Sequence, residues 1–190
     1  MPSAREMSRA ASLGASHRGR SGLSKGGFVY GKILVPLDGS KPAEVVLPYV
    51  QELARRFDSE VTLVQVIAPL SKLVTEAMPV GMEPSGAAAA VGLEAASEAL
   101  RAEREDARSY LAAVAERLKA EKTEVRTEIV EGAAGDAIVD YAHQQGMDLI
   151  AMSTHGRSGL SRVVYGSVAD HVLRRAGTPV LLIRSREAKT

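Results

Sequence analysis

The stretch STHGRSGLSRVVYGS, residues 153–167, joins an expected buried strand to an expected helix. The strand is the apolar run over 149–153, and the helix extends from about Ser167 to Arg175. Glycines in such a loop let the backbone approach a ligand, and the free N–H groups at a helix start bind anions. The stretch therefore predicts an α/β fold with a phosphate site at this loop.

The flanking sequence repeats the alternation of strand and helix. Further apolar runs predict strands at 33–37, 61–67, 125–130 and 180–183. Helical spacing of apolar residues predicts helices at 46–57, 100–118 and 137–143, with Ser40 as N-cap of the first and a kink at Pro48. Five strands and four helices in alternation predict a doubly wound five-stranded parallel sheet with helices on both faces. Residues 69–92, rich in Pro, Gly and Ala, are expected to form a long loop.

Charge divides the chain into a basic tail and a mildly acidic domain. The first 32 residues carry six basic side chains against one acidic one, a net charge of +5, which leaves −4 for the remainder because the total is +1. Residues 1–30, rich in Ser, Gly, Ala and Arg without apolar periodicity, are expected to be a disordered basic tail. We expect residues 31–187 to form a single nucleotide-binding domain.

Composition also limits the classes of function. The sequence contains no cysteine, which excludes thiolate chemistry, Cys-ligated zinc and disulfides and favours a cytoplasmic location. The Arg- and Ser-rich tail leaves an organellar location open as the alternative. Since the domain is acidic and no apolar run approaches the roughly 18 residues of a membrane span, neither nucleic acid nor membrane is an expected partner.

The hexapeptide GRSGLS occurs twice, at 19–24 and at 156–161, and both copies run on to Val-Tyr-Gly. Only the second copy has a strand before it and a helix after it. The P-loop-like pattern at 14–21 lacks the same context, which a true P-loop requires. We therefore assign a site to the second copy alone.

Three segments carry a family resemblance: KILVPLD at 32–38, the stretch at 153–167, and TPVLLI at 178–183. Together they resemble the universal stress protein family over roughly residues 31–185. Its ATP-binding branch has a glycine, two residues, a second glycine, nine residues, and a third glycine followed by Ser or Thr. Gly156, Gly166 and Ser167 match that pattern, whereas Ser153 stands at the first glycine. The resemblance implies the strand order 3-2-1-4-5.

The resemblance also implies roles for individual residues. Asp38 would contact the adenosine end of ATP, Pro36 would shape the turn, and Val66 would meet adenine through its backbone. Gly132 would wall the pocket, and Ser153 would weaken the affinity without abolishing it. The phosphates, carrying Mg²⁺, would be held by Gly156, Arg157, Gly166, Ser167 and Val168.

Several of these residues also have structural interpretations. Asp38, Gly39 and Ser40 make a good turn and N-cap, and Val66 is a core residue by composition. Ser167 and Asp170 have the spacing of a capping box. His155 is interpreted as a structural loop residue because no carboxylate lies near it in the sequence.

The function expected from this pattern is an ATP-binding stress-response module with little or no hydrolysis, because no general base is evident beside the loop. The alternatives are a nucleotide-free dimeric interaction protein of the same fold and a slow ATPase. A NAD-dependent dehydrogenase is disfavoured, since no Gly-x-Gly-x-x-Gly follows the first strand. The resemblance implies a homodimer paired through Val180, Leu181, Leu182 and Ile183, unless residues 184–190 cover that edge.

Overall fold

The structure is a computed structural model that describes residues 30–77, 86–120, 123–155 and 166–185. The predicted disordered tail, apart from Tyr30, lies outside the described residues, and so does most of the glycine loop before Gly166. The described ranges contain every strand that the sequence predicts.

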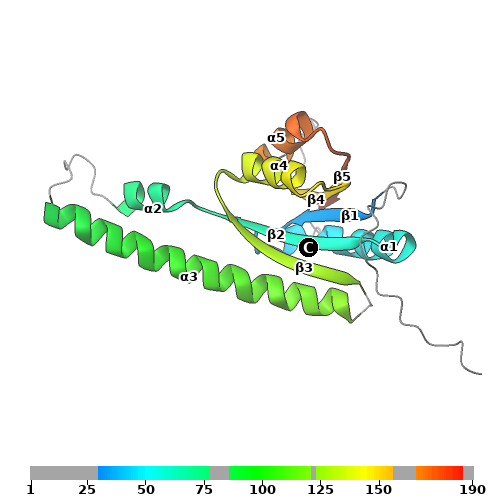
Figure 1. Ribbon diagram of the computed structural model, residues 1–190, viewed down its shortest axis with the longest axis horizontal. Helices are drawn as coiled ribbons and strands as arrows, with labels where there is room; N and C mark the ends of the chain where they lie inside the picture. Colours follow the sequence, from blue (N-terminus) through cyan, green and yellow to red (C-terminus); the bar gives the residue numbers. More distant parts are fainter. Residues whose placement is uncertain (1–29, 78–85, 121–122, 156–165, 186–190) are drawn as a thin grey trace, which may run out of the picture.

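A five-stranded parallel sheet with the order β3-β2-β1-β4-β5 forms the centre of the molecule (Figure 1). Its strands are β1 (Lys32–Pro36), β2 (Glu60–Ile67), β3 (Glu124–Glu131), β4 (Leu149–His155) and β5 (Val180–Ser185). The predicted fold class and strand order are therefore confirmed. Because β1 lies between β2 and β4, the carboxyl ends of these three strands meet at one edge of the sheet, where doubly wound folds bind ligands.

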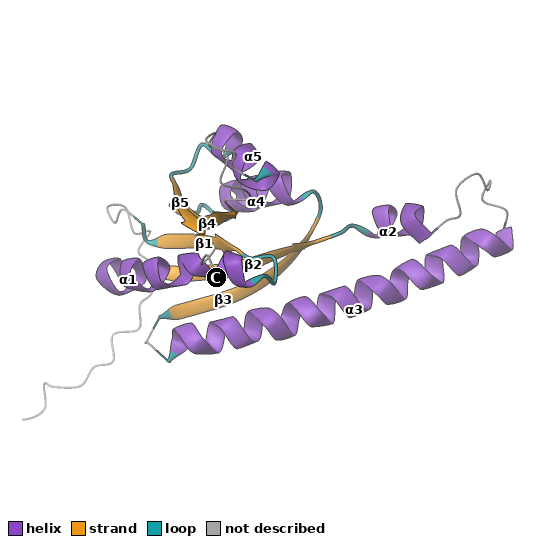
Figure 2. Ribbon diagram, turned by 180° about the vertical axis from the view of Figure 1, so that it is seen from behind, coloured by secondary structure: helices purple, strands orange, loops and turns teal. Residues whose placement is uncertain are grey.

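Helices cover both faces of the sheet (Figures 1 and 2). They are the 3-10 helix η1 (Lys41–Val46) and the α-helices α1 (Leu47–Phe57), α2 (Leu70–Ala77), α3 (Gly86–Lys119), α4 (Ala134–Gln144) and α5 (Ser167–Arg175). One core cluster joins η1, α1 and the second half of α3 to one face, and another joins α4 and α5 to the other face. Successive side chains of β1 point to opposite faces of the sheet, so Ile33 and Val35 belong to the first cluster and Leu34 belongs to the second.

The segment after β1 begins with a capped 3-10 helix. Ser40 Oγ accepts a hydrogen bond from the N–H of Ala43 at 3.3 Å, as expected of an N-cap. The helical segment divides at Leu47, where η1 ends and α1 begins, with Pro48 in the first turn of α1. A proline fits a first turn because its missing N–H would have no partner there. The segment therefore changes from 3-10 helix to α-helix just before Pro48, instead of forming one helix that is kinked at Pro48.

The predicted loop over 69–92 is wrong for residues 70–77 and 86–92. Residues 70–77 form α2, and α3 already begins at Gly86. Alanine is the best helix former, so the run of four alanines at 87–90 favours helix although it was grouped with the loop. With 34 residues α3 is about 50 Å long, about twice the length of β2, and its first half extends past the sheet beside α2 (Figure 2).

Candidate functional site

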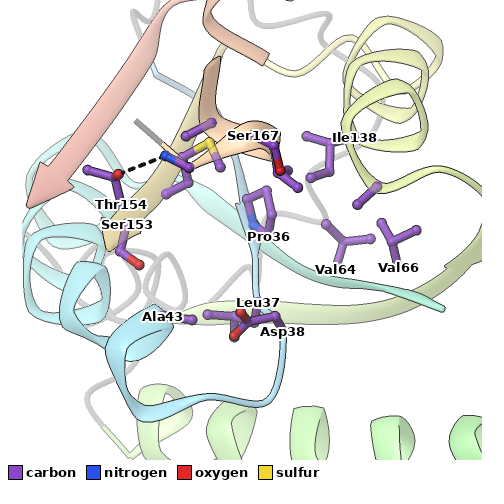
Figure 3. A pocket seen from close by; sticks show the side chains of 15 residues that line it. Pro36, Leu37, Asp38, Ala43, Val64, Val66, Ile138, Ser153, Thr154 and Ser167 are labelled. Atoms are coloured by element: carbon purple, nitrogen blue, oxygen red, sulfur yellow. Dashed lines mark hydrogen bonds between the residues drawn. The ribbon is translucent and has the colours of Figure 1, made fainter. Parts of the chain in front are cut away.

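A pocket of about 240 Å³ lies at the carboxyl ends of β1, β2 and β4 and at the starts of α4 and α5 (Figure 3). Residues from these elements and from η1 line it. They are Pro36, Leu37, Asp38, Ala43, Val64, Val66, Ala134, Ile138, Met152, Ser153, Thr154, Gly166, Ser167, Val168 and Ala169.

One wall of the pocket is aliphatic. Val64 and Val66 come from β2, Ile138 from α4 and Met152 from β4, and Figure 3 shows the two valines together on one side. Val64 is fully buried, whereas Val66 is partly exposed. Val66 therefore belongs both to the second core cluster and to the pocket. Such a wall suits a flat apolar group such as a nucleobase.

The start of α5 forms the polar side of the pocket. Its N-cap is Gly166, and no side chain caps the helix. Ser167 is the first helical residue, and Asp170 pairs with Arg174 at 2.8 Å, so the capping-box interpretation of Ser167 is wrong. The hydrogen bond from Arg174 also lowers the pKa of Asp170. The uncapped N–H groups and the positive end of the helix dipole therefore favour an anion at this point.

Thr154 ties the end of β4 to the start of α5. Its buried Oγ1 accepts a hydrogen bond from the N–H of Gly166 at 3.5 Å, drawn as the dashed line in Figure 3. Sequence reasoning did not select Thr154, although a hydroxyl that directly follows Ser153 at a strand end was the available signal. The contact fixes where the helix start lies relative to the sheet.

Asp38 lies in a turn and in the pocket at the same time. Its Oδ1 accepts hydrogen bonds from the N–H of Ser40 at 3.0 Å and from Ser40 Oγ at 2.6 Å. Gly39 between them has φ +82°, a conformation that favours glycine. The turn interpretation thus describes the local structure. Asp38 also lines the pocket, and it is the only acidic or basic side chain among the described residues that do so.

Ser153 occupies the position where the family pattern has a glycine. It is partly buried at the end of β4, beside Ile183 of β5, and it lines the pocket. With glycine at this position, the space that the hydroxymethyl group of Ser153 fills would be open to a ligand. The side chain therefore narrows this side of the pocket.

Of the other predicted residues, Gly132 is described by the structure and does not line the pocket. Gly132 has φ +151°, and its N–H donates to the carbonyl of Ile67 at 3.1 Å; Ala134, two residues later, lines the pocket instead. Gly156 and Arg157 lie outside the described residues, and the side chain of His155 is not described.

A charged cluster joins η1 to α3 behind the pocket residue Ala43. The carboxylate of Glu44 pairs with Arg117 at 2.7 Å and with Lys41 at 3.2 Å. Burial alone would raise the pKa of Glu44, but the hydrogen bonds from Arg117 and Lys41 bring it below its usual value. Burial, followed by the negative charges of Glu44 and Asp38, raises the pKa of Tyr110 to about 12. The cluster therefore couples α3 to the turn that holds Asp38.

Two features are absent from the part of the chain that the structure describes. No group of three or more His, Cys, Asp or Glu side chains in this part of the chain could hold a metal ion. Among the helices described, none has the length and apolar character needed to cross a membrane.

Comparison with known proteins relates this chain to one family. The model of the universal stress protein family matches residues 30–184. The universal stress protein MJ0531 of Methanocaldococcus jannaschii is 31% identical over 163 residues, which cover 85% of this chain and 86% of that protein.

Solved structures share the fold. The structure of MJ0577, from the same organism, has a TM-score of 0.66 and 27% identity and covers 84% of this chain and 99% of its own. A universal stress protein from Archaeoglobus fulgidus, solved in complex with dAMP, has a TM-score of 0.51 and 22% identity, with 82% of this chain and 98% of that chain covered. At that identity the second likeness concerns the fold alone.

Proposed function

Since this chain belongs to the universal stress protein family, we propose that its pocket binds ATP and that the protein is a nucleotide-dependent stress-response module with little or no hydrolysis. The observation that carries the proposal is the combination of an aliphatic wall with an uncapped helix start in one pocket. A nucleotide needs both, because its base is flat and largely apolar and its phosphates are anionic.

The residues fit the two ends of the nucleotide. The base would lie against Val66 and Ile138, and Asp38 would contact the adenosine end. The phosphates would be held by the backbone N–H groups of Ser167 and Val168, with Gly166 leaving room beside them. Gly156 and Arg157 are expected to add to this phosphate site. Mg²⁺ would be held through the phosphates, which supply the oxygen ligands that the ion prefers.

The pocket favours binding over hydrolysis. A phosphoryl-transfer enzyme needs a side chain that orients or deprotonates the attacking water. Asp38 is the only carboxylate among the described lining residues, and its Oδ1 already accepts two hydrogen bonds from Ser40. We therefore assign the nucleotide a regulatory role, in which occupancy selects a conformation or a partner.

A homodimer is part of the proposal. β5 is an edge strand, and its residues Val180 to Ile183 are aliphatic and only partly buried. An apolar edge strand is a template for pairing, and a two-fold axis is the commonest way to close such a contact. We propose that two copies pair their β5 strands antiparallel to form one continuous sheet.

Isothermal titration calorimetry with ATP and Mg²⁺ tests the binding, and phosphate release measured under the same conditions tests the hydrolysis. We expect saturable binding of one ATP per chain and phosphate release no faster than in buffer without protein. Absence of saturable binding at millimolar ATP would contradict the proposed function. Rapid phosphate release would instead identify an ATPase.

A further inference from the structure

Helices α4 and α5 form adjacent walls of the pocket. Each begins at the pocket, α4 with Ala134 and α5 with Gly166 and Ser167, and the two helices lie side by side (Figures 1 and 2). Neither helix has a side-chain cap. The width of the pocket between these walls therefore depends on how closely the helices approach each other.

The two helices approach each other closely at Gly135, the second residue of α4. A Cβ atom built on Gly135 would lie 2.7 Å from Cδ2 and Cγ of His171 and 3.0 Å from its Cβ. Distances under 3.0 Å do not occur for real Cβ atoms, and the Cβ of His171 cannot move unless α5 moves. The imidazole thus packs directly on the backbone of α4, and only glycine allows this.

Backbone conformation does not explain the glycine. Gly135 is helical and is not among the glycines with positive φ, so alanine would fit the backbone and would be the better helix former. The close approach of His171 is therefore the physical reason for glycine at this position.

The carboxylate of Asp136 lies beside the imidazole. Nε2 of His171 lies 2.8 Å from Oδ1 of Asp136, and Nη1 of Arg175 lies 3.4 Å from the same oxygen. Nε2 is shielded from solvent and makes no hydrogen bond within the described residues, so close packing holds the ring between α4 and α5. Asp136 belongs to the first turn of α4, and His171 follows Ser167 by one helical turn.

We infer that Gly135 and His171 are positioning residues, which set the spacing between the starts of α4 and α5 and thereby the fit of the nucleotide. The inference rests on the proposed function of the pocket. Both residues adjoin it, since Ala134 precedes Gly135 and Ser167 lies one turn before His171. Neither residue lines the pocket, so they act through the residues that do.

Four variants of the full chain test the inference: Gly135→Ala, His171→Ala, the double variant, and Gly86→Ala as the matched control. A Cβ at Gly86 would meet nothing within 4 Å, and Gly86 lies at the start of α3, away from the pocket. The dissociation constant of ATP with Mg²⁺ is measured by calorimetry, and the melting temperature is measured without ligand.

We expect Gly135→Ala to weaken ATP binding about tenfold because the methyl group separates the helices, whereas Gly86→Ala leaves affinity unchanged. His171→Ala removes the two imidazole atoms that the methyl would strike at 2.7 Å and leaves only the Cβ contact at 3.0 Å, so the double variant should bind within about twofold of His171→Ala alone. A purely structural role would lower the melting temperature of Gly135→Ala without changing the affinity of the folded protein.

Two results would overturn the inference and leave the proposed function intact. One is that Gly135→Ala binds ATP with wild-type affinity. The other is that Gly135→Ala weakens ATP binding as much in the His171→Ala background as in the wild-type protein. If the wild-type protein binds no ATP, the proposed function fails, and the inference fails with it.

Discussion

Asp38 is held at the pocket by Ser40. The Ser40 hydroxyl donates to Asp38 Oδ1 at 2.6 Å and accepts from the N–H of Ala43 at 3.3 Å. One side chain therefore caps η1 and orients the carboxylate that faces the pocket. A single hydroxyl thus contributes both to stability and to the shape of the site.

Ser40→Ala should remove both hydrogen bonds and lower the free energy of unfolding by about 1 kcal/mol, the usual cost of losing an N-cap. For a domain of this size, that corresponds to a fall in melting temperature of about 2–4 °C, measurable by calorimetry. Ser97→Ala is the control, because the Ser97 hydroxyl donates only to the carbonyl of Leu93 within an exposed part of α3. Equal melting temperatures of Ser40→Ala and the wild-type protein would contradict this account of the cap.

Ser153→Gly should tighten ATP binding by about threefold or more, because it removes the side chain that narrows the pocket. Ser153→Ala separates crowding from hydrogen bonding, since it keeps the Cβ atom and removes the hydroxyl. If the Cβ atom causes the crowding, Ser153→Ala should bind ATP with the affinity of the wild-type protein. Weaker binding by Ser153→Gly, measured by the same titration, would instead assign the serine a favourable contact with the nucleotide.

Residues that follow a strand end could be predicted from the sequence. Asp38 lies just after β1, Ser153 lies near the end of β4 and Gly166 directly precedes α5, and all three line the pocket. Gly132 satisfies the same rule but lies beside the pocket, because its N–H bonds to Ile67 and the chain turns into α4 after it. The position of Thr154 beside Ser153 near a strand end marks it as a candidate, but its role depends on a contact with Gly166 twelve residues later, which the sequence does not show.

At the scale of elements, α3 is joined to η1 through Glu44. The carboxylate of Glu44 is 11% exposed and pairs with Arg117 of α3. Burial opposes its ionisation, but the hydrogen bonds from Arg117 and Lys41 outweigh burial and lower the pKa below the ordinary value of 4.5. A carboxyl group whose pKa is lower in the folded state stabilises the fold above its unfolded-state pKa, and this stability is lost as pH falls through the folded-state pKa.

Glu44→Gln should therefore destabilise the protein by about 1 kcal/mol at pH 7 and by much less at a pH below the lowered pKa, where the wild-type carboxylate is protonated. Thermal unfolding at the two pH values measures the difference. Glu52→Gln is the control, because Glu52 pairs with Arg55 while 45% exposed, and exposed ion pairs contribute little. A loss that is equal at both pH values would show that the ionised form of Glu44 is not what stabilises the contact.

A helix that packs on the sheet, such as α5, could be predicted from the sequence, whereas the helical segments that extend past the sheet could not. The bounds expected for α5, Ser167 to Arg175, agree with the structure, because its apolar residues Ala169 and Val172 face the core and its start is marked by Gly166. The first half of α3 packs beside α2 past the end of the sheet, so no wide apolar stripe marks it. Prolines and glycines then made residues 69–92 resemble a loop.

At the scale of the whole molecule, the two edges of the sheet differ. β3 carries charged side chains along its length, among them Glu124, Arg126 and Glu128, which discourage pairing with another strand. β5 is aliphatic from Val180 to Ile183. The β5 edge is therefore the one suited to a second copy of the chain.

Leu182→Pro should convert the proposed dimer to a monomer without unfolding it. The N–H of Ile150 donates to the carbonyl of Pro179, so in the alternating pattern of a parallel ladder Leu181 faces β4 and the N–H of Leu182 faces away. Proline at 182 removes a donor from the outer edge only. Light scattering should give twice 20.1 kDa for the wild-type protein and 20.1 kDa for the variant.

Leu181→Pro is the contrasting variant, because it removes a donor to β4 and should destabilise the sheet itself. Circular dichroism distinguishes this loss of fold from loss of the dimer. A wild-type mass of 20.1 kDa would contradict the dimer at once.

The central claim is that the nucleotide binds at the start of α5. Gly166 has φ −55° and a Cβ there would meet nothing within 4 Å, so valine is compatible with the unliganded fold but would enter the space assigned to the phosphates. The direct measurement is an ATP titration of Gly166→Val beside Gly22→Val, a glycine-to-valine substitution in the first copy of GRSGLS. We predict at least a tenfold loss of affinity for Gly166→Val and wild-type affinity for Gly22→Val. Equal affinities of the two variants would contradict the claim.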